Sequence, residues 1–377
     1  MTDAGCRSCG HTELSTVFDA PSVPVENSRL YADAAAARAV TRGDLVIQQC
    51  ERCGFVQNSA FDPDLVVYDD DYEDSQGHST FFQAFAGRVI DEMIDTHQLK
   101  GARALEIGCG DGDFLRRFCE ASGGTGIGLD PALGRRAAVD GAVELRAESF
   151  GVGSGHFDAD VVICRHTLEH VPDIADFLAV IRGELADRPD VVVYLEVPDS
   201  GRIATEAAFW DIYFEHCSYV DQVGFDGLLR RSGFEVVMSR LDYNGQYLVA
   251  HARLASPTPF EPRGDRPDFG ALADSVEEWR RWAAQTEGRR CAVWAASSKA
   301  VAFLSAVPEF APVVAVDINP AKAGRYLPGS GLAICHPDDL PGFAVDTVVV
   351  MNPVYMDEIS EELARVGVEA ELLGLGA

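Results

Sequence analysis

The sequence has no long hydrophobic run and comparatively few basic residues. None of its apolar stretches reaches the roughly 18 residues of a membrane-spanning helix, so we expect no transmembrane segment. The N-terminus also lacks a basic region followed by an apolar core, which argues against a signal peptide and favours the cytoplasm. With 31 Lys and Arg against 60 Asp and Glu, the net charge is −29. Such a surface repels phosphate backbones and anionic membranes, so neither nucleic acid nor a membrane is an expected partner.

Cysteine, by contrast, is not scarce, and its spacing is informative. Two C-x-x-C pairs, Cys6/Cys9 and Cys50/Cys53, are each followed by glycine, as a tight turn around a metal favours. Four thiolates in two such pairs suit tetrahedral Zn²⁺ with no open position, and hence a structural site. A redox dithiol is the alternative, although two matched pairs are more than redox chemistry needs.

The length of 377 residues predicts two or three domains, and the sequence pattern divides the chain accordingly. Residues 1–75 form a four-cysteine zinc module, whose last acidic stretch serves either as a lid over a cofactor or as a surface turn. Residues 76–255 alternate strand-like and helix-like segments, which predicts a doubly wound sheet. Residues 256–272 are rich in proline, glycine and charge and are predicted to be a linker. Residues 273–377 repeat the alternation and predict a second, smaller α/β domain.

The turn after the first strand of the second unit indicates the cofactor. An apolar run at 102–107 leads into alternating glycines and then into an apolar-periodic helix. Glycines let a ligand press against the backbone, and the N–H groups of the helix start face it. A dinucleotide fingerprint would be G-x-G-x-x-G, but the third glycine comes early here. The pattern instead resembles motif I of the class I S-adenosylmethionine (SAM) methyltransferases; the alternative is a glycine-rich turn of another α/β domain. The motif residues are Glu106, Gly108, Gly110 and Gly112.

Other residues are expected at the cofactor from their place after a strand. Asp130 ends the second strand, where its carboxylate can accept hydrogen bonds from two ribose hydroxyls. Glu148 and Ser149 follow the third strand, where the adenine slot should lie, and Arg165 ends the fourth strand, near the methyl donor. Asn244-Gly245 joins two further strands as a hairpin. The predicted fold is therefore α/β, a Rossmann-like class I SAM methyltransferase sheet with an antiparallel edge.

An aromatic segment at 210–219 carries the candidate catalytic residues. Tyr213 and His216 are three residues apart and share a face if the segment is a helical turn, and Glu215 lies on the same turn. Such a set can abstract a proton and hold the resulting anion. Alternatively, the aromatic rings pack against the sheet and His216 bonds a core carbonyl. His170, after the fourth strand on the cofactor side, is either a second active-site residue or a helix-entry residue that contacts backbone.

Taken together, the zinc module, the SAM domain with its Tyr-x-Glu-His segment and the C-terminal α/β domain resemble the sugar C-methyltransferases of antibiotic biosynthesis. Those enzymes methylate C3 of thymidine-diphosphate 4-keto-deoxysugars. The resemblance implies that His216 removes the proton next to the ketone and that the resulting enolate attacks the SAM methyl. It implies a structural zinc and no catalytic metal. It also places four further residues at the site, with the last of them in the lid: Tyr213, Glu215, His170 and Tyr72.

Three segments depart from that family's pattern, at residues 243–247, 295–299 and 350–355. All three should lie near the acceptor, so other acceptors stay open. One alternative is a SAM-dependent O- or N-methyltransferase that acts on another secondary metabolite or a glycan. Another is a SAM-binding protein without catalysis. In each enzymatic case we expect a small-molecule acceptor and a monomer or homodimer.

Overall fold

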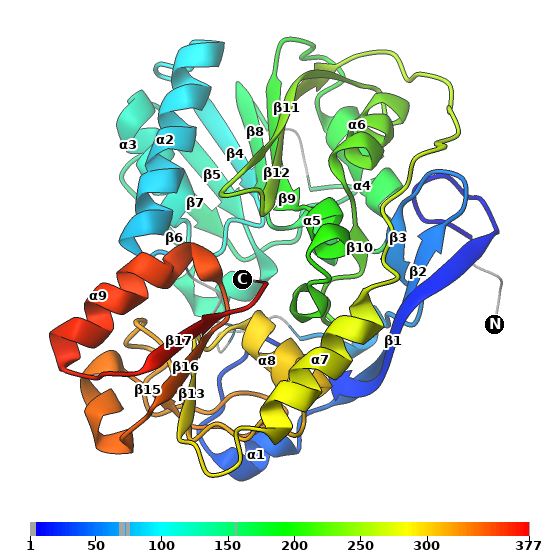
Figure 1. Ribbon diagram of the computed structural model, residues 1–377. Helices are drawn as coiled ribbons and strands as arrows, with labels where there is room; N and C mark the ends of the chain where they lie inside the picture. The colour runs from blue at the N-terminus through cyan, green and yellow to red at the C-terminus, as the bar shows by residue number, and fades with distance from the viewer. Residues whose placement is uncertain (1–4, 68–71, 73–75, 155–156, 377) are drawn as a thin grey trace.

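Three β-sheets make up the chain in the computed structural model, which describes residues 5–67, 72, 76–154 and 157–376. Figure 1 shows the largest sheet with its helices above, the C-terminal sheet below, and the N-terminal strands running along one side from the first to the second. Among the described residues, no helix has both the length and the apolar character needed to cross a bilayer. Most of the expected lid, residues 68–71 and 73–75, lies outside the described residues.

The largest sheet has eight strands in the order β11-β12-β9-β8-β4-β5-β7-β6. Pairing is parallel from β9 to β7 and antiparallel at both edges. The strands are β4 (Arg103–Ile107), β5 (Thr125–Leu129), β6 (Ala138–Asp140), β7 (Val143–Arg146), β8 (Val161–Arg165), β9 (Val192–Pro198), β11 (Phe234–Asp242) and β12 (Tyr247–Leu254). The helices of this unit are α2 (Thr80–His97), α3 (Asp113–Ser122), α4 (Ile174–Glu184), α5 (Ser200–Thr205) and α6 (Gln222–Arg231).

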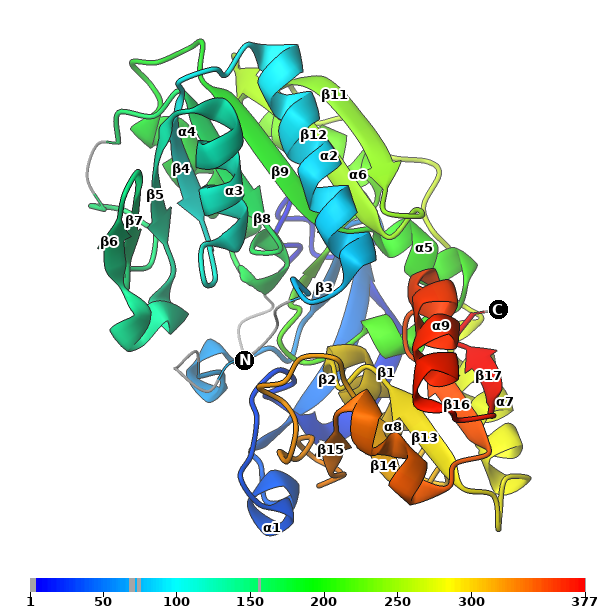
Figure 2. The ribbon, with the colours of Figure 1, turned by 90° about the vertical axis from the view of Figure 1, so that its left-hand side faces the viewer.

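Strand β8 shows why this sheet is covered on both faces. Val161 and Ile163 pack in one core cluster with α2 and α3, whereas Val162 and Cys164 pack in another with α4 and α6. Successive side chains of a strand point to opposite faces, so its uninterrupted apolar run needs helices on both sides. Figure 2 shows α2 lying across the sheet. The predicted Rossmann-like sheet with an antiparallel hairpin edge is confirmed. The second antiparallel edge, β6, was not predicted, because its three residues are all exposed.

The C-terminal unit is a five-stranded parallel sheet in the order β15-β14-β13-β16-β17. The predicted alternation of strands and helices is present, and the two-residue β15 adds a strand that the sequence pattern did not indicate. Its strands are β13 (Cys291–Trp294), β14 (Val314–Val316), β15 (Ile334–Cys335), β16 (Thr347–Val350) and β17 (Glu371–Gly374), and its helices are α7 (Leu272–Ala284), α8 (Ser298–Ala306) and α9 (Met356–Val366).

The N-terminal sheet borrows a strand from the middle of the chain. Its order is β1-β2-β3-β10, and β10 immediately follows the candidate catalytic segment. The segment between the two cysteine pairs forms two antiparallel strands with a short helix between them. The elements are β1 (Leu14–Pro24), α1 (Ala34–Arg38), β2 (Arg42–Cys50), β3 (Val56–Asn58) and β10 (Ser218–Tyr219). Because β10 belongs to this sheet, the N-terminal unit directly supports the chain next to the candidate site. We propose domain boundaries after residues 75, 255 and 272.

The link between β1 and α1 touches both larger units. Tyr31 and Tyr326 exchange backbone hydrogen bonds of 3.4 and 3.0 Å, and the Ser28 and Ser298 hydroxyls are 3.0 Å apart. Close by, the Asn27 N–H donates to the Glu215 carboxylate at 2.6 Å. This link therefore bridges the C-terminal sheet and the candidate catalytic segment.

Candidate active site

A cavity of roughly 460 Å³ lies where the carboxyl ends of the large sheet's strands meet the C-terminal unit. Such an edge is the usual ligand site of an open α/β sheet. The end of β8 and the segment after α5 supply one wall, and the turns after β13, β14 and β16 supply the other. The residues of the cavity wall used below are Tyr72, His166, Glu169, His170, Tyr213, Glu215, His216, Gln246, Lys299, Lys322 and Asn352.

Tyr213 and His216 meet inside this cavity. The 3₁₀ helix η4 (Phe209–Asp211) ends before them, and a single turn follows, closed by a 3.2 Å hydrogen bond from the His216 N–H to the Tyr213 carbonyl. The Tyr213 hydroxyl lies 2.8 Å from His216 Nε2. The two side chains thus come together through one turn rather than through a helix.

Glu215, which lies between Tyr213 and His216 in the sequence, is almost fully buried, at 1% exposure. One carboxylate oxygen accepts the 2.6 Å bond from the Asn27 N–H, and the other accepts a 3.1 Å bond from the Tyr72 hydroxyl. The segment between β1 and α1 and the Tyr72 hydroxyl therefore both hold the turn of Tyr213 and His216 through the Glu215 carboxylate.

His170 packs edge-on against His216, with ring centroids 4.9 Å apart, and its ring donates a hydrogen bond to the Glu215 carbonyl. Burial lowers the pKa of His170. Burial, followed by the neighbouring His170 and His166, holds the pKa of His216 well below its ordinary value of 6.5. Both rings are therefore neutral at neutral pH, the form in which an imidazole can accept a proton.

His166 is a pocket residue that the sequence analysis did not single out as a site residue. Its Nε2 lies 2.9 Å from a Glu196 carboxylate oxygen and its Nδ1 lies 3.5 Å from Glu169. Burial opposes the charged form, but these two carboxylates outweigh it and raise the pKa of His166 to about 9. Its backbone is strained, with φ at +49°, which a non-glycine residue seldom adopts outside functional sites. Its position directly after a buried strand is the one sequence signal that could have indicated it.

The glycine motif forms an open backbone cradle at the same sheet edge. Gly108, Gly110 and Gly112 all have positive φ. A Cβ on Gly108 would lie 2.0 Å from the Thr167 hydroxyl, whereas a Cβ on Gly110 would project into open space. The Gly110 N–H donates to Asp130 at 2.9 Å, which fixes that carboxylate beside the cradle.

Glu106 offers a further test of whether SAM fits these residues. It is 2% exposed, burial raises its pKa to about 8, and its Oε2 has no hydrogen-bond partner among the described residues. An unpartnered buried carboxylate oxygen is costly, and a ligand cation such as an α-ammonium group would satisfy it. The cradle and this buried acid therefore fit SAM.

The remaining predicted cofactor residues, Glu148, Ser149 and Arg165, differ from one another in burial. Glu148 and Ser149 are exposed in the loop after β7. Arg165 is buried, donates to Glu196 at 2.7 Å and stacks 4.0 Å over the Phe114 ring, so it connects the ends of β8 and β9. None of these residues lines the cavity. The Thr167 hydroxyl donates to the Ile107 carbonyl at 3.2 Å and lies close to Gly108 of the cradle.

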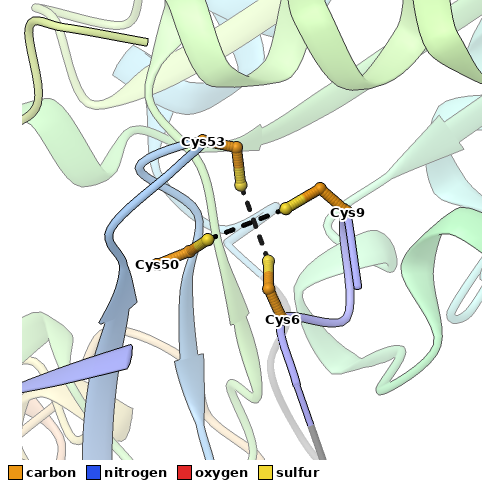
Figure 3. Close-up of side chains that lie close together, drawn as sticks. All are labelled: Cys6, Cys9, Cys50 and Cys53. Carbon is orange, nitrogen blue, oxygen red and sulfur yellow. Dashed lines mark hydrogen bonds between the residues drawn. The ribbon is translucent and has the colours of Figure 1, made fainter. Parts of the chain in front are cut away.

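The four predicted metal ligands come together at one point (Figure 3). Cys6 Sγ and Cys53 Sγ are 3.5 Å apart, and Cys9 Sγ and Cys50 Sγ are 3.7 Å apart. Sulfur atoms around a tetrahedral Zn²⁺ with bonds of about 2.3 Å lie about 3.8 Å from one another. The geometry and the thiol donors fit a closed zinc site.

The three departing segments meet at the far wall of the cavity. Gln246 and Asn352 exchange side-chain hydrogen bonds of 2.7 and 3.1 Å, and Ala295 has a φ of +83° where glycine is favoured. The cations here are already paired, since Lys299 lies 2.5 Å from Asp211 and Lys322 lies 3.1 Å from Asp317. This wall is therefore hydrogen-bonded and locally neutralised before any acceptor binds.

Two family models match this chain: "Methyltransferase domain" over residues 78–239 and "C-methyltransferase C-terminal domain" over residues 279–370. C-methyltransferase NovU from Streptomyces niveus is 26% identical over 94% of this chain and 90% of its own length. Among solved structures, the 1,6-didemethyltoxoflavin-N1-methyltransferase of Burkholderia thailandensis is similar over 48% of this chain and 83% of its own, with 22% identity and a TM-score of 0.38. Magnesium protoporphyrin IX methyltransferase of Synechocystis PCC 6803 is similar over 46% and 84%, with 14% identity and a TM-score of 0.36.

Proposed function

We propose that this chain, which belongs to the family of SAM-dependent C-methyltransferases, methylates a carbon next to a ketone. The acceptor we propose is a keto-deoxysugar activated by a nucleotide, as the family resemblance implies. The observation that supports this reaction most directly is the contact of Tyr213 with His216 inside a cavity beside the SAM cradle.

His216 is the proposed base. A ketone acidifies the neighbouring C–H, and a neutral imidazole can take that proton while the C–H electrons pass into an enolate. Burial raises the pKa of Tyr213 well above its ordinary value, so its hydroxyl stays protonated. It can accept from His216 Nε2–H, which leaves the Nδ1 lone pair to take the proton, and can donate to the enolate oxygen. The hydrogen bond between Glu215 and Tyr72 fixes the turn that carries Tyr213 and His216.

SAM, when bound, supplies an electrophilic methyl group on a sulfonium. Asp130 and the glycine cradle keep their predicted roles, at the ribose and at the methionine moiety. Glu106, predicted only as a residue of the motif, is proposed to hold the methionine ammonium. Glu148 and Ser149 are proposed at the adenine. Arg165 is proposed to shape the edge of the site, because its guanidinium is engaged by Glu196.

The cysteine cluster is proposed to hold a structural Zn²⁺. Its second C-x-x-C pair, Cys50 and Cys53, lies at the junction of β2 and β3. Strand β3 pairs with β10 through Val56 and Gln57. The Asn58 N–H also donates to the Cys217 carbonyl at 3.1 Å. Zinc would therefore stabilise the strand that holds the chain just after His216.

Incubation with SAM and a thymidine-diphosphate 4-keto-6-deoxysugar in D₂O tests this function. We expect deuterium at the carbon next to the ketone in recovered, unmethylated acceptor, and in the product a methyl group that has replaced the hydrogen on that carbon, both followed by NMR and mass spectrometry. Deuterium exchange without SAM would isolate the proton-abstraction step. Methyl transfer to oxygen or nitrogen, or no exchange at all in protein that binds SAM, would contradict the enolate reaction.

Asp130→Ala is expected to weaken SAM binding by roughly 30-fold or more, because two charge-assisted hydrogen bonds to the ribose are lost. Isothermal titration calorimetry measures this directly. Asp140→Ala is the matched control, since Asp140 is an exposed carboxylate on the edge strand β6. Equal SAM affinity in both variants would remove Asp130 from the cofactor site.

A SAM-dependent O- or N-methyltransferase is the second candidate, and the far wall favours it. The Gln246–Asn352 pair and Lys299, which is paired with Asp211, occupy the segments that depart from the sugar C-methyltransferase pattern. An acceptor hydroxyl also needs a base, so His216 serves this reaction too. The position of the transferred methyl group decides between the two candidates.

A further inference from the structure

We propose that Glu169, His170 and His216 bind a divalent transition-metal cation of the Zn²⁺ class, and that the bound cation inhibits methyl transfer. The inhibitory half rests on the proposed function of His216 as the base. The binding half does not, because it concerns only these three side chains and the cation.

The donor set is the first argument. One ligand atom from each of the three side chains lies within 4.8 Å of the other two. Two imidazoles and one carboxylate are a ligand set that Zn²⁺ takes in sites with an open position. Donor atoms around a tetrahedral zinc lie roughly 3.4 Å apart, so small side-chain rotations bring these atoms to bonding distance.

Each of the two imidazoles already has a hydrogen-bonding partner that fixes the orientation of its ring. The His170 ring donates to the Glu215 carbonyl, and His216 Nε2 lies 2.8 Å from the Tyr213 hydroxyl. Metal-ligating histidines are usually held in this way, with one ring nitrogen bonded to an oxygen and the other on the metal. The surroundings therefore supply the outer contacts of a metal site.

Glu169 is the independent observation that points to a ligand. The residue is 4% exposed, and its Oε2 has no hydrogen-bond partner among the described residues, while Oε1 lies 3.5 Å from His166. A buried carboxylate oxygen without a partner is energetically costly. A cation held jointly with His170 and His216 would satisfy that oxygen.

A bound cation would compete with proton abstraction for the His216 side chain. A metal ligand must donate the same imidazole lone pair that proton abstraction needs. His216 cannot do both at once, so the cation-bound chain lacks its base. This second site differs from the cysteine cluster, which is closed and built from thiolates.

The test uses the full chain with its cysteine cluster loaded with zinc, titrated with further Zn²⁺ by calorimetry and assayed for metal content. We expect a second zinc per chain, with binding weakened roughly tenfold or more in Glu169→Gln and in His170→Asn. Glu362→Gln, which alters another carboxylate of the cavity wall, is the matched control and should keep the second zinc. Co²⁺ in the second site should lack the thiolate charge-transfer band of the cysteine cluster.

A single zinc in the wild-type chain, or a second zinc that Glu169→Gln leaves unchanged, would overturn the site. A second zinc bound as expected but without slower methyl transfer would overturn the inhibition alone. If the ketone is not methylated under any condition, the proposed function fails while the metal count still decides the site.

Discussion

His216→Asn is expected to lower methyl transfer by about 10³-fold, because a positioned general base contributes about that much to proton abstraction. Asparagine keeps a polar side chain next to Tyr213 but offers no lone pair of comparable basicity. We also expect deuterium exchange into the acceptor to fall in parallel, since the same step limits both. Single-turnover kinetics with bound SAM and NMR of the exchanged acceptor measure the two effects.

Two controls separate loss of the base from loss of the fold. SAM affinity should stay unchanged in His216→Asn, because His216 is not among the residues proposed to hold SAM. His251→Asn removes another buried histidine, one that bonds His97 rather than the cavity residues, and should keep the activity. Imidazole added to a His216→Gly variant should restore part of the rate. Full activity in His216→Asn would assign the base to another residue.

Cys53→Ser is expected to abolish zinc binding at the cysteine cluster and to lower the unfolding temperature by roughly 10 °C or more. Structural zinc contributes folding free energy directly, and the N-terminal sheet has little core of its own. Because β3 holds β10, we expect activity to fall further than the loss of folded protein explains. Metal analysis and differential scanning calorimetry provide the measurements.

Cys335→Ser is the matched control for this prediction. Cys335 is also buried but lies in β15, outside the cysteine cluster. This variant should keep the zinc of the cysteine cluster and most of the activity. Equal zinc content in Cys53→Ser and the unsubstituted chain, with an unchanged unfolding temperature, would show that the cluster is not a metal site.

Features encoded locally were predictable from the sequence. The alternating glycines from Gly108 onward, and Asp130 at the end of the next strand, follow the strand–turn–helix pattern, and the structure places both at one sheet edge. The two C-x-x-C pairs were also readable, because the ligand type and spacing of a zinc site lie within short segments.

Features that depend on distant pairing were not predictable. The Asn27 N–H that holds Glu215 comes from 188 residues away, and β10 is a two-residue strand defined only by its partner β3. The left-handed backbone of His166 has no sequence signature, because it is imposed by the packing around Glu196 and Glu169. Periodicity carries no information about such contacts, so the site's supporting residues became visible only in three dimensions.

The link between β1 and α1 also sets an order of assembly during synthesis on the ribosome. Asn27 and Tyr31 emerge early, but Glu215 and Tyr326, which they contact, are translated much later. The contacts that fix this link are therefore complete only after the C-terminal sheet has emerged. A nascent chain that stops before Tyr326 has the Asn27–Glu215 contact but lacks the backbone hydrogen bonds that tie the link to the C-terminal unit.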